Sequence, residues 1–261
     1  MSAHLVPVPH RFDVIVVVPA RDEEERIGAC LRSIVRASDR AALVIGRLAV
    51  VVVADGCNDR TTDIARSVLA PRPMSLVAEC DLGNVARVRA LGVNLGRNLL
   101  ESNASDRTWI ASTDADTTVP GNWVLQHVAA ARRGLRGVAG VVDVVAFDGL
   151  PAVAQQHFAE TYTDLLPAEG GHPHVHAANL GVRLDAYDQA GGWGCLPCSE
   201  DRDLWTRLRQ TGAIVESRTA LRVVTSGRSV GRVAGGFAEC LRRQVLDRGH
   251  DEPDDDRRKS A

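Results

Sequence analysis

Short runs of branched apolar residues alternate with longer amphipathic segments along the first half of the chain. The strongest runs, at 14–18, 48–54 and 108–112, contain almost no polar residues. Runs of this kind are typical of strands that are buried on both faces of a sheet. Strands that alternate with helices usually form a parallel sheet covered by helices on both sides. The sequence therefore predicts an α/β fold with a mainly parallel sheet.

The expected elements can be placed by residue number. Strands are expected at 13–18, 48–54, 75–78, 108–112, 137–146 and 213–224. Helices are expected at 23–37, 61–69, 84–100, 120–133, 151–165, 201–210 and 232–248. Pro120 is placed at a helix start, where its missing N–H is harmless. Asp59 and Ser199 are expected to cap the helices that follow them.

Composition narrows the class of protein. The 261 residues suit one large α/β domain or two small ones, and a net charge of −2 provides no basic field for a nucleic acid. We see no signal peptide, and the longest apolar runs are too short to span a bilayer. We therefore expect a cytoplasmic protein without a transmembrane segment, for which peripheral membrane contact stays open. The six cysteines are expected to be thiols rather than disulfides.

Polar residues gather where the predicted strands end. The clusters at 19–25, 55–59 and 114–116 each follow one of the three strong apolar runs. Open α/β sheets bind ligands at the carboxyl ends of their strands. Three independent strand ends that carry carboxylates therefore predict a ligand site at one edge of the sheet.

The segment T-D-A-D-T at 113–117 is the sharpest local feature. Side chains alternate in an extended segment, so Asp114 and Asp116 can point the same way. Two converging carboxylates favour a hard cation such as Mg²⁺ or Mn²⁺, which can bridge diphosphate oxygens. The alternative is a solvated turn. In the segment V-V-V-A-D-G-C at 51–57, Asp55 is placed to accept hydrogen bonds from a base or ribose.

The ordered set of motifs resembles the family 2 glycosyltransferases, which have a GT-A fold. The motifs are V-V-V-P-A-R-D-E-E at 16–24, V-V-V-A-D-G-C-N-D-R-T at 51–61, G-N-V-A-R-V-R-A-L-G-V at 83–93, T-D-A-D at 113–116, H-A-A-N-L-G-V-R at 176–183, G-G-W at 191–193 and S-E-D-R-D-L-W-T-R-L at 199–208. Each motif alone is degenerate, but the ordered set covers roughly 13–225. The resemblance implies a GT-A nucleotide-binding sheet flanked by helices, with a smaller acceptor-side region after it.

The resemblance also implies site residues. The nucleotide side would comprise Pro19, Ala20, Glu23, Asp55, Arg89 and Asp114. Asp116 would bind Mn²⁺ or Mg²⁺ directly, with Asp114 in the ribose or metal shell. Asp201 would be the general base of an inverting displacement, and Glu200 would position the acceptor. Read without the resemblance, these two acids simply favour a helix N-terminus.

Domain boundaries follow the same resemblance. Residues 1–12 are expected to be an extension, and 13–248 a single GT-A domain. Its nucleotide-binding half would be 13–135 and its acceptor and catalytic half 136–248. The charged residues 249–261 are expected to be a disordered tail. The partners would be a UDP-, GDP- or dTDP-sugar and an unknown hydroxyl acceptor, with no nucleic acid.

Several features keep more than one interpretation. Trp193 would stack on a sugar face or belong to the core. The alternating His172, His174 and His176 would line an acceptor pocket, stay exposed or, less readily, bind zinc. Cys195 and Cys198 are expected to be loop thiols. Three basic candidates and one histidine lie downstream. One of Arg222, Arg228 and Arg232 could meet the diphosphate, while His250 is the first histidine after Asp201, which leaves the third metal ligand open.

Other enzyme classes would carry other motifs after the first strand. A dinucleotide-dependent oxidoreductase would need G-x-G-x-x-G after the first strand, and that motif is absent. A nucleotidyltransferase would carry a glycine-rich basic loop there, whereas this chain has the acidic P-A-R-D-E-E. A retaining transferase and a non-catalytic protein that binds nucleotide sugars both remain alternatives.

Overall fold

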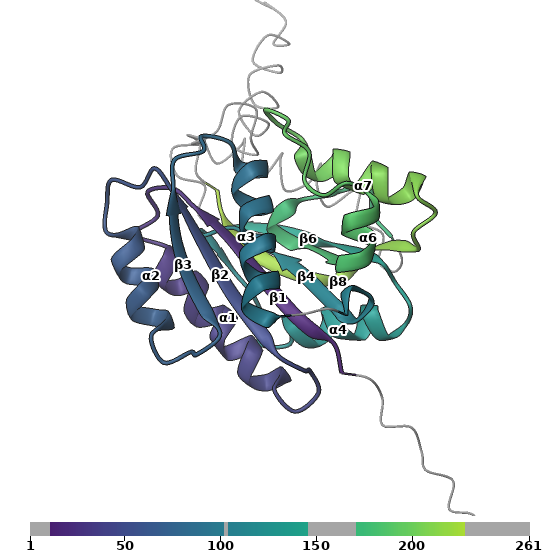
Figure 1. The fold of residues 1–261 in the computed structure, drawn as a ribbon, viewed down its shortest axis with the longest axis horizontal. Coiled ribbons are helices and arrows are strands. Elements are labelled where there is room, and N and C mark those ends of the chain that lie inside the picture. The colour runs from purple at the N-terminus through teal and green to yellow at the C-terminus, as the bar shows by residue number, and fades with distance from the viewer. Residues whose placement is uncertain (1–10, 102–103, 146–170, 228–261) are drawn as a thin grey trace, which may run out of the picture.

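The computed structural model describes residues 11–101, 104–145 and 171–227 (Figure 1). One sheet contains eight strands in the order β3-β2-β1-β4-β7-β6-β8-β5. Their bounds are β1 Asp13–Ala20, β2 Leu48–Asp55, β3 Ser75–Cys80, β4 Thr108–Ser112, β5 Thr117–Thr118, β6 Gly137–Val145, β7 Leu180–Arg183 and β8 Val215–Ser226. The predicted α/β class is confirmed.

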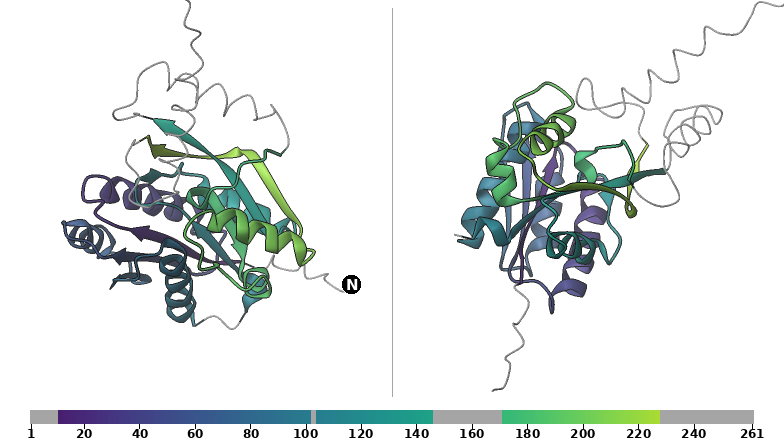
Figure 2. Two further views of the ribbon diagram at one scale, coloured as in Figure 1. Left: turned by 90° about the horizontal axis from the view of Figure 1, so that it is seen from above. Right: turned by 90° about the vertical axis from the view of Figure 1, so that its right-hand side faces the viewer.

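Helices cover both faces of this sheet (Figures 1 and 2). The helices are α1 Ile27–Ala41, α2 Thr61–Leu69, α3 Val85–Leu100, α4 Trp123–Arg132, α6 Leu184–Gln189 and α7 Glu200–Gln210, with short 3-10 turns at Ser105–Arg107 and Ala177–Asn179. Alternate residues of β1 divide between the two faces. Val14 and Val16 pack with α1 and α4, whereas Ile15 and Val17 pack with α3. The long apolar runs therefore contribute side chains to two hydrophobic cores, one on each face of the sheet.

The first four strands in the sheet order run parallel, so their carboxyl ends meet at one edge. β7 reverses this direction because it pairs antiparallel with both β4 and β6, while β6 and β8 lie side by side in parallel (Figure 2). The sequence predicted neither β7 nor the two-residue β5. The sheet is thus parallel in its N-terminal half and mixed in its C-terminal half.

Two helices begin three or four residues later than predicted, and one predicted cap makes no hydrogen bond. The first helix begins at Ile27 rather than residue 23, because residues 24–26 form a separate turn in which the Glu23 carbonyl accepts from the Arg26 N–H at 3.0 Å. The fourth begins at Trp123, because Pro120 accepts from the Trp123 N–H in a preceding turn. Ser199 occupies the N-cap position of α7, but its φ is +61° and its side chain makes no capping bond.

The predicted cap at Asp59 is present. Asp59 Oδ1 accepts from the Thr61 N–H at 2.9 Å, so it satisfies a donor at the start of α2. Several predictions lie outside the described residues: the helices at 151–165 and 232–248, Arg228, Arg232, His250 and the charged tail. In the part of the chain that is described, no helix has the length and apolar character needed to cross a membrane.

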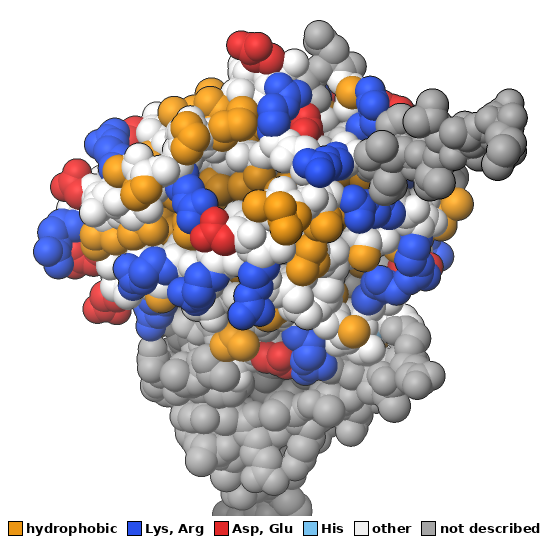
Figure 3. Space-filling model, turned by 90° about the horizontal axis from the view of Figure 1, so that it is seen from below, with side chains coloured by type: hydrophobic (Ala, Val, Ile, Leu, Met, Phe, Trp, Pro, Cys, Tyr) orange, Lys and Arg blue, Asp and Glu red, His pale blue; other side chains and the backbone are white. Residues whose placement is uncertain are grey.

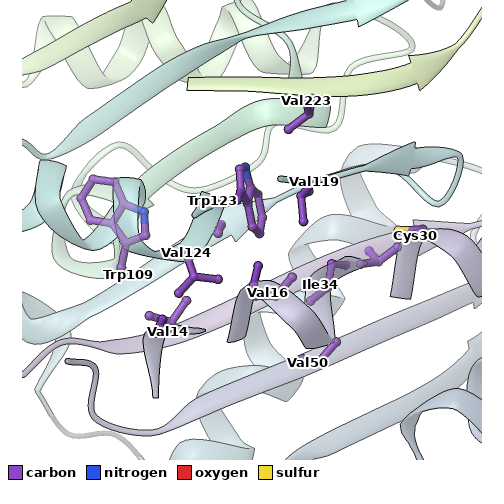
Figure 4. Close-up of a cluster of buried hydrophobic side chains, with 14 of the residues drawn as sticks. Val14, Val16, Cys30, Ile34, Val50, Trp109, Val119, Trp123, Val124 and Val223 are labelled. Carbon is purple, nitrogen blue, oxygen red and sulfur yellow. The ribbon is translucent and has the colours of Figure 1, made fainter. Parts of the chain in front are cut away.

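Trp109 and Trp123 lie in the core cluster that Figure 4 shows, and both indole nitrogens bind buried polar side chains. Trp109 Nε1 donates to His127 Nδ1 at 3.2 Å, and burial lowers the pKa of His127 to about 3. Trp123 Nε1 donates to Asn179 Oδ1 at 3.0 Å. The Asn179 amide then donates to the carbonyls of Val141 and Leu221, both at 2.9 Å. One fully buried asparagine therefore joins α4, β6 and β8.

Side chains of both signs are mixed on the surface. On the face shown in Figure 3, Lys and Arg side chains are scattered among apolar and acidic ones instead of forming one continuous patch. That pattern agrees with the small net charge of −2.

Candidate active site

The polar strand ends meet at one edge, as the sequence predicted. Because β1 lies between β2 and β4, the segments that follow all three strands are neighbours. Ala20 and Glu23 are buried there, with 4% and 5% of their surfaces exposed, and Pro19 pairs with Val53 of β2. This edge therefore holds the predicted nucleoside-binding segment.

Asp55, at the end of β2, is used mainly by the neighbouring loop. Its carboxylate accepts from the Leu82 N–H at 2.6 Å and from the Gly83 N–H at 3.2 Å. Arg21 lies 3.8 Å away, with about half of its side chain exposed. Burial raises the pKa of the adjacent Cys80 thiol, and the charge of Asp55 raises it further, to about 11. Asp55 thus fixes the loop between β3 and α3, close to where a ligand would sit.

Asp114 and Asp116 follow β4 with different partners. Asp114 Oδ1 accepts from Arg89 Nη2 at 2.6 Å, and 36% of the Asp114 side chain is exposed. Asp116 Oδ1 accepts from the Thr225 hydroxyl of β8 at 3.3 Å. β8 therefore supports the acidic segment through Thr225, which no sequence motif singled out.

A buried thiol lies beneath this acidic segment. Cys30 of α1 donates from Sγ to the Asp114 carbonyl at 3.3 Å. Burial raises the pKa of Cys30 well above its usual value, and the charges of Asp116, Asp114 and Glu23 raise it further. Three carboxylates therefore act on this thiol, and one of them, Asp114, is itself paired with Arg89.

Glu200 and Asp201 form the first turn of α7. Glu200 Oε1 accepts from Arg89 Nη1 at 2.6 Å. Asp201 accepts from the Ala177 N–H at 3.1 Å and from the Arg202 N–H at 2.7 Å. Burial raises the pKa of Asp201, and the charge of Glu200 raises it further. A carboxylate with a raised pKa is a better proton acceptor than an ordinary one.

Trp193 belongs mostly to the core, with 8% of its surface exposed. Its backbone N–H donates to the Tyr187 hydroxyl at 3.1 Å, and its ring lies 5.4 Å from the Arg89 guanidinium carbon. The geometry resembles a cation–π contact. The loop that carries Trp193 is therefore attached to the same arginine as the two acidic segments.

The three alternating histidines do share one face. The ring centroids of His172 and His174 are 5.9 Å apart, and those of His174 and His176 are 6.0 Å apart. Burial lowers the pKa of His176 to about 3 and also lowers that of His172. They form no compact ligand cluster, because the one such group among the described residues lies elsewhere. The zinc alternative therefore gains no support from the geometry.

The cysteines in the described ranges are all free thiols, as predicted: Cys30, Cys57, Cys80, Cys195 and Cys198. Cys195 is exposed and Cys198 half-buried, in the loop before α7. Asn84 Nδ2 donates to the Leu196 carbonyl of that loop at 2.9 Å. The C-x-x-C sequence is thus a loop without a disulfide.

Asp22, Cys57 and Asp59 form a cluster that the sequence did not single out. Their potential ligand atoms all lie within 4.8 Å of one another. Both carboxylates already bind backbone, since Asp22 accepts from the Asn58 N–H at 2.7 Å and Asp59 from the Glu24 N–H at 3.0 Å. These bonds join the loops after β1 and β2, which explains the cluster without a metal.

The chemistry of Asp114 and Asp116 suits a divalent cation. Carboxylate oxygens are hard ligands, and Mg²⁺ is commonly held by one or two carboxylates while phosphate oxygens and water complete its shell. Among the residues that the structure describes, neither aspartate joins a cluster of three protein ligands. A diphosphate would therefore have to contribute to the coordination.

The fold defines a GT-A type protein, and acidic side chains gather at the carboxyl edge of its parallel strands. The family described as "Glycosyltransferase like family 2" matches residues 10–229, and the chain belongs to that family. A search of curated proteins found no match.

Solved structures share the fold at low sequence identity. A mannosyltransferase from Pyrobaculum calidifontis, in complex with GDP-Man and Mn²⁺, is 18% identical with a TM-score of 0.63, and the match covers 91% of this chain and 62% of that one. TarS from S. aureus is 13% identical with a TM-score of 0.60, covering 83% and 37%. Residues 1–349 of TarS with UDP are 12% identical with a TM-score of 0.59, covering 92% and 71%. This chain thus spans from about a third to just over two thirds of these proteins.

Proposed function

We propose that this chain transfers a sugar from a nucleotide-diphosphate sugar to a hydroxyl group, with inversion at the anomeric carbon. The observation that carries the proposal is the convergence of two acidic segments. Asp114 from the end of β4 and Glu200 from α7 lie on either side of Arg89, each 2.6 Å from it. Residues 13–135 would bind the donor, and residues 136–248 would bind the acceptor and carry the catalytic base.

Asp114 and Asp116 would hold Mn²⁺ or Mg²⁺ at the donor diphosphate. When bound, such a cation neutralises charge that develops on the leaving nucleotide. The GDP-Man and Mn²⁺ in the mannosyltransferase structure support this assignment by analogy. Pro19, Ala20, Glu23 and Asp55 would form the nucleoside side of the site, at the carboxyl ends of β1 and β2.

Asp201 would act as the general base. Its carboxylate would take the proton from the acceptor hydroxyl while that oxygen attacks the anomeric carbon. The carbon–oxygen bond to the diphosphate would break on the opposite face, and a single displacement of this kind inverts the anomeric centre. The raised pKa of Asp201, caused by burial and then by Glu200, favours proton uptake.

The Asp201→Asn variant tests this assignment. Amide nitrogen cannot accept the proton, so we expect transfer to fall by about 10³-fold while nucleotide binding stays within about threefold. Nucleotide release in the presence of Mn²⁺ and calorimetric titration with nucleotide measure the two effects. Asp203→Asn is the matched control, because Asp203 lies in the same turn but pairs with Arg207. Unchanged turnover in Asp201→Asn would refute the base.

Two alternatives predict other products. A retaining transferase would preserve the anomeric configuration, which NMR of the product distinguishes from inversion. A non-catalytic nucleotide-sugar-binding protein would bind donor without releasing nucleotide, and Asp201→Asn would then change nothing.

The donor can be identified by thermal shift. A ligand that binds only the folded state raises its melting temperature. We expect one class among UDP-, GDP- and dTDP-sugars to do so, and to do so more strongly with Mn²⁺ present.

A further inference from the structure

Arg89 is a buried cation shared by two carboxylates. Its side chain is 4% exposed, and its two terminal nitrogens each lie 2.6 Å from a carboxylate oxygen, one of Asp114 and one of Glu200. Burial lowers the pKa of Arg89, but Asp114 and Glu200 more than offset this, so the pKa lies above the usual value. The guanidinium therefore stays charged, and its two partners remove the penalty of an unpaired buried charge.

The partners of Arg89 come from distant parts of the chain. Asp114 is 25 residues away and Glu200 is 111 residues away. Asp114 precedes the proposed metal ligand Asp116, and Glu200 precedes the proposed base Asp201. Trp193, whose ring lies 5.4 Å from the guanidinium, belongs to the loop that leads into α7. Arg89 is thus the shared contact of the donor-side and acceptor-side segments.

We infer that Arg89 is a positioning residue that fixes the first turn of α7, and with it Asp201, relative to the donor segment at Asp114. The inference rests on the proposed function. A planar guanidinium can bind two carboxylates at once with defined directions, whereas a lysine ammonium acts as a single point charge. Misplacing a reacting group by about 1 Å can cost about 10²-fold in rate. Arg89 would act through its partners without touching the reacting atoms.

The same contact makes a prediction about metal affinity. Asp114 Oδ1 is engaged by Arg89, so the guanidinium competes with a cation for that oxygen. Removing the positive charge leaves the carboxylate with more negative potential. A variant without the guanidinium should therefore bind Mn²⁺ more tightly, even though it transfers sugar more slowly.

The variants are Arg89→Met, Arg89→Lys and, as a matched control, Arg97→Met. Arg97 lies on the same helix and pairs with Asp188 of α6, away from the site. For Arg89→Met we expect kcat to fall by about 10²-fold with the donor KM within about threefold. Arg89→Lys should recover part of the rate, and Arg97→Met should keep it. Titration of Mn²⁺ alone, followed by the EPR signal of the free ion, should show a several-fold lower Kd in Arg89→Met.

A double-mutant cycle with Glu200→Gln separates positioning from general destabilisation. If Arg89 acts through Glu200, the double variant should be no slower than the slower single variant. Three outcomes would each overturn the inference. The losses in kcat of the two single variants could multiply in the double variant, or Mn²⁺ could bind Arg89→Met no more tightly than it binds the wild type. The third is an Arg89→Met variant that keeps the same rate as Arg97→Met. If Arg89→Met does not fold, Arg89→Lys tests the positioning through kcat, with a smaller expected loss, and Arg89→Gln, which also removes the charge, takes the place of Arg89→Met in the Mn²⁺ titration. Wild-type protein that releases no nucleotide would instead refute the proposed function, and the Mn²⁺ titration would still test the contact between Arg89 and Asp114.

Discussion

At the scale of single residues, the site is organised by charge. Arg89 was expected to approach a nucleotide, and in the structure it binds Asp114 and Glu200. No local pattern could reveal this, because a pairing over 111 residues depends on the whole fold. Residue types and their order predicted which acidic residues form the site, and their roles stay predictions. Their partners, such as the Thr225 hydroxyl at Asp116, required the structure.

The proposed base, Asp201, leads to a prediction about the pH dependence of transfer. Burial raises the pKa of Asp201 and Glu200 raises it further, while Arg89 and the N–H groups of Arg202 and Ala177 lower it. A base must be deprotonated, so activity is lost as the pH falls through this raised pKa. Glu200→Gln removes one raising charge, and we expect the acid limb of the kcat/KM profile to move to lower pH.

The profile should be measured beside Glu216→Gln as a control. Glu216 lies on β8 and pairs with Arg133 and Arg218 at the surface, so this variant should leave the acid limb where it is in the wild type. An acid limb that stays in place, or moves upward, in Glu200→Gln would contradict the assigned electrostatics.

At the scale of elements, long regular segments were predictable and their ends were not. The bounds 61–69 and 108–112 agree with α2 and β4, since their apolar patterns are uninterrupted. The predicted start of α1 was wrong because residues 24–26 form a separate turn before the helix begins. In the same segment the N–H groups of Glu23 and Glu24 bind side chains of Thr61 and Asp59, and no local pattern shows such contacts between loops.

Close packing of α3 on β1 gives a prediction about stability. A Cβ atom at Gly96 would lie 2.3 Å from Ile15 Cγ2, and the branched Ile15 side chain has little freedom to move. Helix propensity favours alanine by about 1 kcal/mol, but overpacking costs about 1–3 kcal/mol. The 2.3 Å contact places the cost in the upper part of that range, so we expect Gly96→Ala to lower the free energy of unfolding by up to about 2 kcal/mol.

Urea unfolding measures this change, with Gly28→Ala as the matched control. At Gly28 of α1 the nearest atom to an added Cβ is the flexible end of Arg32, at 3.1 Å. That variant should be neutral or slightly stabilising. A Gly96→Ala protein at least as stable as the wild type would show that α3 can move away from β1 at little cost.

At the scale of the whole molecule, the parallel half of the sheet followed from the sequence and the mixed half did not. Alternating strands and helices predict parallel neighbours up to β4. The reversed β7 is four residues long and lies in a segment rich in Gly and His, so it carries little local signal. Asn179, directly before β7, attaches this segment to β6 and β8, because its buried amide donates to the carbonyls of Val141 and Leu221.

The most direct test of the account is a crystal structure with Mn²⁺ and the nucleotide sugar identified by thermal shift. The anomalous signal of manganese locates the cation without ambiguity. We predict a peak within about 2.1–2.4 Å of an Asp116 carboxylate oxygen and of the donor diphosphate, with the anomeric carbon facing Asp201. A cation and diphosphate bound away from Asp116 would contradict the central claim.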